Sequence, residues 1–396
     1  MTEPYDQELP LFLQHDGLMP GTALQATRDR PGLERITTVF GQQAWLVACA
    51  ADVRTVLGNS ALFTTGDSVP MFRPDDPGKD DLPGAILFMD PPEHTMIRSM
   101  LTPSFTARAL ARLEPRITEI VSEHLDAMAD AGAPADLVAS FSWPVPSQVI
   151  CEMLGIPLED RKGFQGFVDA SFDFTISEEE RAAGNQGISE YIHRLADRAR
   201  DKPGSDLIGT LIREQGDRLS SKNLAAIGAT MLQAGHETTA EMMASSTFAL
   251  LTHHDQLQLL RNDPGLIRNA VDELLRYLAI VQISAPRRAT RDTVVGGQDI
   301  ARGDLLQVSL PSANHDPALI PDPERLDLTR EASSHLAFGH GIHYCLGAPL
   351  ARLEMTIALP ALLRRFPDLA LAVAPEAVEY KIGSVVHGVK ALPVTW

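Results

Sequence analysis

A glycine-rich loop near the C-terminal end of the sequence constrains this chain more than any other feature. Residues 338–347 read FGHGIHYCLG, in which three glycines bracket Cys345. Glycine permits tight turns and lets another group approach the main chain closely, so a large flat group can lie against such a loop. A helical run follows at once, over residues 346–366, and the free N–H groups at its start favour a thiolate over a thiol.

Three chemical roles are open to Cys345 on these observations alone. The first is a buried structural cysteine, since unpaired cysteine is among the most buried residue types. The second is a zinc ligand together with His340 and His343, although their spacing matches no usual tetrahedral pattern. The third is a single axial thiolate on a haem iron, with the glycines allowing the macrocycle to pack against the loop.

The order F-G-x-G-x-H-x-C-x-G closely resembles the haem-binding loop of the cytochrome P450 family, and the resemblance extends from about residue 35 to the C-terminus. It implies a mainly helical α+β fold, with a large helical part and a small β-rich part in one domain over residues 1–396. It also implies haem b, with Cys345 as the iron ligand.

A second motif, AGHETT, occupies residues 234–239 of a long apolar stretch. A threonine inside a helix can bond the carbonyl one turn back and leave a polar notch. The alternatives are an energetically unfavourable polar patch in a packed helix, or a capping-box sequence that lies in the middle of a helix. The motif resembles the family's oxygen-binding segment, which implies that Glu237 is the acid and Thr238 the hydroxyl, beside Ala234 and Gly235.

A third motif places Glu273 and Arg276 at positions i and i+3 of one helix face, close enough to pair. Alone this is a weak signal, because surface pairs at that spacing are common and contribute little. It matches the family's E-x-x-R signature, in which the pair is structural. A Pro/Asp-rich meander over residues 317–330 follows, as the resemblance requires.

The segment DPPEHTMIRSM, residues 90–100, predicts a helix with Asp90 as its cap and His94 and Arg98 on one face. Such a face can bind carboxylates, or it can be a solvated basic surface. The resemblance implies haem propionates there. The cofactor-binding positions that it implies are His94, Arg98, Ala234, Gly235, Arg287, Phe338, Gly339, His343, Cys345 and Gly347.

Periodicity predicts where the helices and strands lie. We expect strands at residues 37–40 and 44–48, a helix at 51–57 and a long loop at 67–85. Helices follow over about 92–278 and 346–366, and strands at 293–296 and 305–309. The β-rich part therefore lies near 35–66 and 280–310 and in a C-terminal β region.

Charge and cysteine content limit the partners and the location. With 34 basic and 52 acidic residues the net charge is −18, which argues against nucleic-acid binding. Three scattered cysteines form no disulfide framework, so we expect a cytoplasmic protein. Residues 224–251 are apolar, but Glu237 and Glu241 interrupt them, so a buried helix is expected rather than a membrane span.

The resemblance implies a monooxygenase that inserts one oxygen atom of O2 into a C–H bond of a mid-sized hydrophobic small molecule. Electrons would come from NAD(P)H through ferredoxin reductase and ferredoxin. We expect the protein to be a monomer. Alternatives are oxidative coupling or hydroxylation of a carrier-bound peptide, and haem ligand binding without turnover. The expected ferredoxin surface contains Arg108, Arg112 and Arg352. The expected substrate contacts are Met71, Phe72, Ile86, Leu87, Phe174, Leu232, Val281, Ile283, Val385 and Val386.

Overall fold

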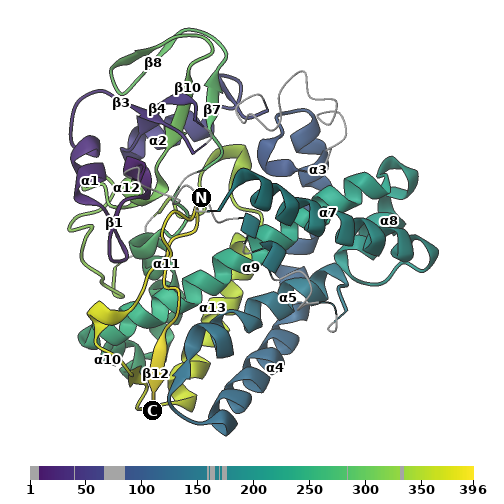
Figure 1. Cartoon of the computed structure of the whole chain (residues 1–396), viewed down its shortest axis with the longest axis vertical. Coiled ribbons are helices and arrows are strands. Elements are labelled where there is room, and N and C mark those ends of the chain that lie inside the picture. Colours follow the sequence, from purple (N-terminus) through teal and green to yellow (C-terminus); the bar gives the residue numbers. More distant parts are fainter. Residues whose placement is uncertain are drawn as a thin grey trace.

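The computed structural model describes residues 9–39, 41–66, 85–157, 160, 166–168, 170–171, 176–282, 284–330 and 334–396. The predicted loop at 67–85 lies almost wholly outside these residues. A β-rich part lies at one end of the molecule, and the rest is mainly helical with the small sheet of β12 (Pro393–Thr395) at the opposite end (Figure 1).

The β-rich part is built on a five-stranded sheet with the order β3-β4-β10-β7-β5. Its strands are β3 (Glu34–Thr37), β4 (Gln43–Val47), β5 (Phe63–Thr64), β7 (Arg287–Ala289) and β10 (Leu305–Val308). Strand β10 runs parallel to β4, so segments about 260 residues apart in sequence are joined in one sheet. Helix α2 (Ala50–Gly58) and the hairpin β8 (Thr293–Val295) to β9 (Gln298–Ile300) complete this part.

The predicted strands at 44–48, 293–296 and 305–309 and the helix at 51–57 are confirmed to within one residue at each end. The strand predicted at 37–40 is wrong in its bounds. Strand β3 instead covers Glu34–Thr37, because its pairing with β4 places Glu34 opposite Leu46 and Thr37 opposite Gln43. After Thr37 the chain turns, with the Gly41 N–H donating to the Thr38 carbonyl.

The helical part is organised around α9 (Ser221–Thr252), which α5 (Pro144–Leu154), α7 (Glu178–Asp201) and α13 (Ala348–Arg365) contact. Helix α9 begins with a capping box of Ser220 and Asn223, and nearly all of its residues after 238 are buried. The other helices here are α4 (Ala107–Ala131), α8 (Leu207–Gln215), α10 (His254–Asn262) and α11 (Ile267–Leu278). In the part of the chain that the structure describes, no helix is both long enough and apolar enough to cross a bilayer.

Helix α3 (Glu93–Leu101) begins later than the sequence predicts, and Asp90 is not its cap. The carboxylate of Asp90 instead accepts hydrogen bonds from the backbone N–H groups of Thr65 and Gly66, at the end of β5. The prediction that Asp90 caps this helix is therefore wrong, because the carboxylate satisfies donors of another segment.

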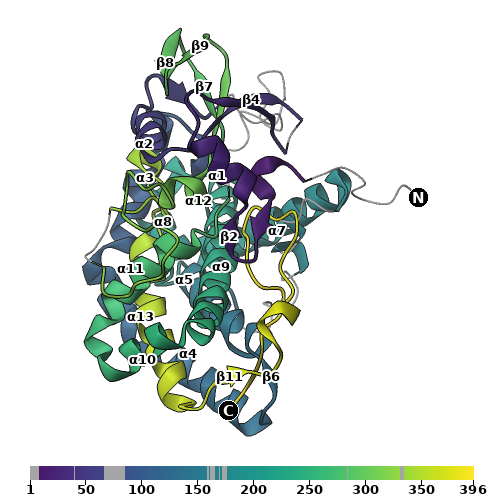
Figure 2. The same ribbon diagram turned by 90° about the vertical axis from the view of Figure 1, so that its left-hand side faces the viewer.

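The C-terminal segment connects both parts of the molecule. Strands β11 (Ala370–Leu371) and β12 (Pro393–Thr395) pair with each other, and β12 also pairs with β6 (Ala135–Asp136). Between β11 and β12 the chain passes beside the hairpin of β1 (His15–Asp16) and β2 (Met19–Pro20), as Figure 2 shows. The rings of His15 and His387 stack there with centroids 3.6 Å apart. The same segment contacts α9, which brings C-terminal side chains to the AGHETT motif.

Candidate active site

The loop of Cys345 is held against α2 on one side and leads into α13 on the other. The Cys345 N–H donates to the Phe338 carbonyl at 3.0 Å. Gly341 has φ +75°, and a Cβ there would collide with the carbonyl oxygen of Leu57. Gly339 also has a positive φ, but no atom lies within 4 Å of where its Cβ would be. Gly341 is therefore required by packing, while Gly339 leaves open space beside the loop.

Two opposing effects act on the thiol of Cys345. Burial raises its pKa, and the backbone N–H groups of Gly347 and Ala348, with the charges of Arg98 and Arg352, oppose that rise. The N–H groups at the start of the helix lower the pKa of Cys345, as the sequence predicts, but burial raises it by more. A metal cation bound to the sulfur would favour the thiolate and so oppose the effect of burial on the pKa.

Four basic side chains from three separate elements gather beside the loop. His94 and Arg98 come from α3, Arg287 from β7 and His343 from the cysteine loop. The rings of His94 and His343 lie 4.3 Å apart, and the Nε2 atoms of both are buried without a hydrogen-bond partner. The helix face that the sequence places at residues 94 and 98 therefore points inward, toward other basic groups.

The charge of Asp90 acts on His94 and Arg287, but within the described residues Asp90 forms no ion pair with either of them. Arg98 donates to the Tyr344 carbonyl at 2.6 Å and Arg287 to the Ala285 carbonyl at 2.8 Å, and no carboxylate of the described residues forms an ion pair with either. Burial lowers the pKa of Arg287 to about 10. Burial and the neighbouring cations lower the pKa of His343 to about 3. A buried cation without an ion-pair partner, such as Arg287, is costly, and the neutral His343 ring can still donate a hydrogen bond, so the cluster is suited to an anionic ligand.

The AGHETT motif lies within α9, which is continuous through these residues. The Thr238 hydroxyl donates to the Ala234 carbonyl at 2.6 Å, which confirms the predicted bond to the preceding turn. Gly235 lies against Ile150 of α5, where an added Cβ would be 2.9 Å from the Cδ1 atom of Ile150. Thr238 is half-buried, whereas Glu237 is buried.

Sequence reasoning missed the partners of Glu237. Lys381 Nζ lies 2.5 Å from Glu237 Oε1 and 2.8 Å from Glu241 Oε2. The lysine belongs to the C-terminal segment, 144 residues from Glu237. Two acidic residues one turn apart in an apolar helix were the available signal, because buried carboxylates require a cation or several donors.

Glu273 and Arg276 on α11 form two hydrogen bonds, at 2.8 and 2.9 Å, which confirms that they pair. Their side chains are 3% and 0% exposed, so the pair is buried. Arg276 also donates to the carbonyls of Asn314 and Pro323, and Arg330 contacts Glu273 at 3.1 Å. The sequence did not indicate that Arg330, at the end of the meander, joins this network.

The expected substrate contacts are only partly described. Met71, Phe72, Phe174 and Ile283 lie outside the described residues. Ile86, Leu232 and Val386 are buried, Val281 and Val385 are half-buried, and Leu87 is exposed. Val281 and Val386 form a β-bridge, and the Gln282 N–H donates to the Val385 carbonyl at 2.9 Å. The structure thus brings the segments of residues 281–282 and 385–386 together.

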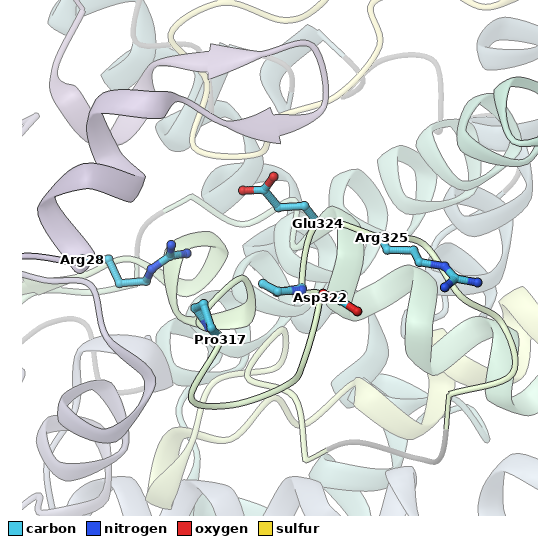
Figure 3. Close-up of a pocket in the computed structure, with 6 residues that line it drawn as sticks. Arg28, Pro317, Asp322, Glu324 and Arg325 are labelled. Carbon is cyan, nitrogen blue, oxygen red and sulfur yellow. The ribbon is translucent and has the colours of Figure 1, made fainter.

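A pocket of about 430 Å³ lies elsewhere, between α1 (Thr22–Arg28) and the meander. Figure 3 shows Arg28 facing the loop that carries Pro317, Asp322, Glu324 and Arg325. Its lining carries both basic and acidic side chains and includes none of the expected site residues. Small-molecule sites are mainly apolar, so this pocket does not suit a hydrophobic substrate.

The three arginines expected on the ferredoxin surface differ in their surroundings. Arg108 and Arg112 are exposed on α4. Arg352 of α13 instead donates to Asp272 at 2.7 Å, and its guanidinium lies over the Phe338 ring, 4.6 Å from the centroid. Arg352 is therefore engaged in holding the cysteine loop.

Comparison with known proteins identifies the family. Residues 178–369 match the family model described as Cytochrome P450. The chain is 39% identical to "Cytochrome P450 FAS1" of Rhodococcoides fascians, covering 98% of this chain and 99% of that one. It is 37% identical to "Vitamin D(3) 25-hydroxylase" of Pseudonocardia autotrophica, covering 100% and 97%.

Solved structures agree with these relatives. The crystal structure of CYP105P1 in complex with filipin I has a TM-score of 0.89 and 38% identity, covering 97% of both chains. Since the matches extend over nearly the whole chain at such identity, this protein belongs to the cytochrome P450 family and is a haem-dependent monooxygenase.

Proposed function

We propose that Cys345 is the iron ligand and that the protein hydroxylates a C–H bond of a mid-sized hydrophobic metabolite. The reaction is R–H + O2 + 2e⁻ + 2H⁺ → R–OH + H2O. The observation that carries the site assignment is the basic cluster beside the cysteine loop, in which His94 and Arg287 are buried and Arg98 and His343 are half-buried. Within the described residues, no carboxylate forms an ion pair with Arg98 or Arg287.

The residues present fit a haem. Two propionates would supply the negative charge that the basic cluster lacks and accept hydrogen bonds from the Nε2 atoms of His94 and His343. The macrocycle would lie against Gly339, where the space beside the backbone is open. An iron bound to Cys345 would stabilise the thiolate against the burial that now raises its pKa.

When bound, the haem with its thiolate ligand supplies the reduction and cleavage of O2. The chain's own task on the oxygen side is to deliver protons. Thr238 can hold a water molecule at its hydroxyl, beside the Ala234 carbonyl to which it donates, and Glu237 supplies the proton. The two residues are adjacent in α9.

The proposed substrate class is supported by the expected contacts and by the relatives. The described positions are Ile86, Leu87, Leu232, Val281, Val385 and Val386, and all of them are aliphatic. Apolar linings of medium-sized side chains suit hydrophobic ligands. The vitamin D3 hydroxylase and the protein solved with filipin I are named for molecules of that kind.

We also propose that a ferredoxin, reduced by NAD(P)H through its reductase, delivers the electrons to a monomer in the cytoplasm. Arg108 and Arg112 remain the candidate contacts, since both are exposed, whereas Arg352 is paired with Asp272. A basic patch attracts an acidic partner even on a chain of net charge −18, because docking depends on the local field.

The test of the function is the coupling of electrons to product. Screening a library of hydrophobic metabolites by haem spectral shift identifies a substrate, and a surrogate ferredoxin system then supports turnover. Thr238→Ala should bind haem and substrate and consume NAD(P)H, yet convert a smaller share into hydroxylated product and a larger share into peroxide. Unchanged coupling in Thr238→Ala at full haem occupancy would exclude the proton-delivery role.

A further inference from the structure

Two buried carboxyl groups on α9 share a single lysine. Glu237 and Glu241 lie at positions i and i+4, so they project from the same face of the helix. Lys381 Nζ lies between them, 2.5 Å from Glu237 Oε1 and 2.8 Å from Glu241 Oε2. The two carboxyl side chains are 6% and 2% exposed and that of Lys381 is 27% exposed, so the lysine connects this buried pair to solvent.

The two carboxyl groups are held differently. Glu241 Oε1 accepts hydrogen bonds from the Val389 N–H at 2.7 Å and the Ser245 hydroxyl at 3.2 Å, in addition to the lysine. A Cβ at Gly388 would collide with the same carboxyl, so only glycine permits this approach. Within the described residues, Glu237 has a polar contact with Lys381 alone. Glu241 is therefore fixed, and Glu237 is the one that can turn.

The charges of this group do not balance when both acids are ionised. Two carboxylates and one ammonium leave a net charge of −1 in a buried site, which is unfavourable. Burial raises the pKa of Glu241, opposed by Lys381 and the Val389 N–H. His236 precedes Glu237 in the chain, and because burial lowers its pKa to about 4 it stays neutral and supplies no second cation. One proton bound between the two carboxyl groups makes the site neutral.

We propose that Glu237, Lys381 and Glu241 store one exchangeable proton, which Glu241 holds and passes through Lys381 to Glu237, and that Glu237 then gives it to the oxygen side. This deepens the proposed function and rests on it. Lys381 and Glu241 act only through Glu237, so they are positioning residues rather than catalytic ones.

The transfer balances without any further reactant. Lys381 Nζ–H gives a proton to Glu237 Oε1, and Nζ regains one from Glu241 Oε2–H, so the ammonium is restored and Glu241 becomes the carboxylate. A proton from water, which reaches the partly exposed lysine, then restores Glu241. The Val389 N–H and Ser245 hydroxyl stabilise Glu241 while it is ionised.

Infrared difference spectroscopy of the haem-loaded protein at neutral pH tests the storage without turnover. A protonated carboxyl group has a C=O band that a carboxylate lacks. Glu237→Gln and Glu241→Gln should each remove one such band, because Lys381 then neutralises the remaining carboxylate. Lys381→Met should instead increase the band about twofold, because neither carboxyl group then has a cation.

Two matched controls accompany this measurement. Lys390→Met removes a lysine of the same segment whose ion pair with Glu379 is exposed, and it should leave the band unchanged. Glu354, whose pKa burial raises to about 8, contributes equally in every variant and cancels in the differences. If the protonated carboxyl band is as strong in Glu241→Gln and Glu237→Gln as in the wild type, the proposal is overturned.

Turnover supplies the second arm. Glu241→Gln should lower the rate of product formation about tenfold or more and enlarge the solvent isotope effect, with haem content and substrate spectral shift unchanged. A purely structural Glu241 would lower haem content and leave the isotope effect at the wild-type value. If wild type yields no oxidised product, the proposed function fails, and the infrared arm still decides whether the proton is stored.

Discussion

Removing the buried arginine of α11 should destabilise the protein far more than removing an exposed arginine of the meander. Arg276→Leu leaves Glu273 buried and takes the donor from the carbonyls of Asn314 and Pro323. Glu273 keeps Arg330, at 3.1 Å, and the Asp327 N–H, also at 3.1 Å, so its charge stays partly compensated. Breaking a buried pair in this way costs about 3–5 kcal/mol of unfolding free energy.

That free energy converts to a measurable temperature shift. The unfolding entropy is about 2.1 cal/mol/K per residue, which for 396 residues gives about 0.8 kcal/mol/K. Arg276→Leu should therefore lower the midpoint of thermal unfolding by about 4–6 °C. The assay is circular dichroism of the haem-loaded protein, with haem absorbance recorded in parallel.

Arg325→Leu is the matched control. Arg325 lies in the same meander, its side chain is 65% exposed and its nearest ion-pair distance, to Asp327, is 3.8 Å. Exposed pairs contribute about 0–1 kcal/mol, so its midpoint should move by about 1 °C or less. Equal shifts for the two variants would refute the reasoning that burial makes this pair important.

Three further outcomes follow from the site and its surroundings. Gly341→Ala should lower the haem-to-protein ratio and the unfolding midpoint more than Gly297→Ala does, since both have a positive φ but only Gly341 faces a carbonyl oxygen; equal losses would contradict the packing argument. Unfolding free energy should fall as pH is lowered from 6.5 toward about 4, because the unfolded chain protonates His236 while its buried ring, pKa about 4, stays neutral. His236→Phe should make the midpoint less dependent on pH in that range, because it removes the group that the unfolded chain protonates; an unchanged slope would show that other groups dominate.

The sequence predicted those features that depend on local spacing. The Glu273–Arg276 pair and the Thr238 bond to Ala234 each lie within one helical turn, so helix geometry alone brings the groups together. The strands at 44–48 and 305–309 were also predictable from β-rich composition, although their parallel pairing was not.

Contacts between distant segments could not be obtained in the same way. Lys381 contacts Glu237 across 144 residues because the chain between β11 and β12 returns along α9. No hydrophobic periodicity in the sequence predicts that path. Asp90 looked like a helix cap because caps are a local pattern, yet it binds N–H groups of residues 65 and 66 instead. Arg330 joins Glu273 through a meander whose course depends on tertiary packing.

The most direct test of the central claim is the absorption spectrum of the reduced protein with carbon monoxide. A haem iron bound by the Cys345 thiolate should absorb at about 450 nm, Cys345→Ala should lose that band, and Cys49→Ala and Cys151→Ala should retain it. A stable band at about 420 nm in fresh, active protein, or a band at about 450 nm that survives Cys345→Ala, would contradict the assignment of Cys345 as the iron ligand.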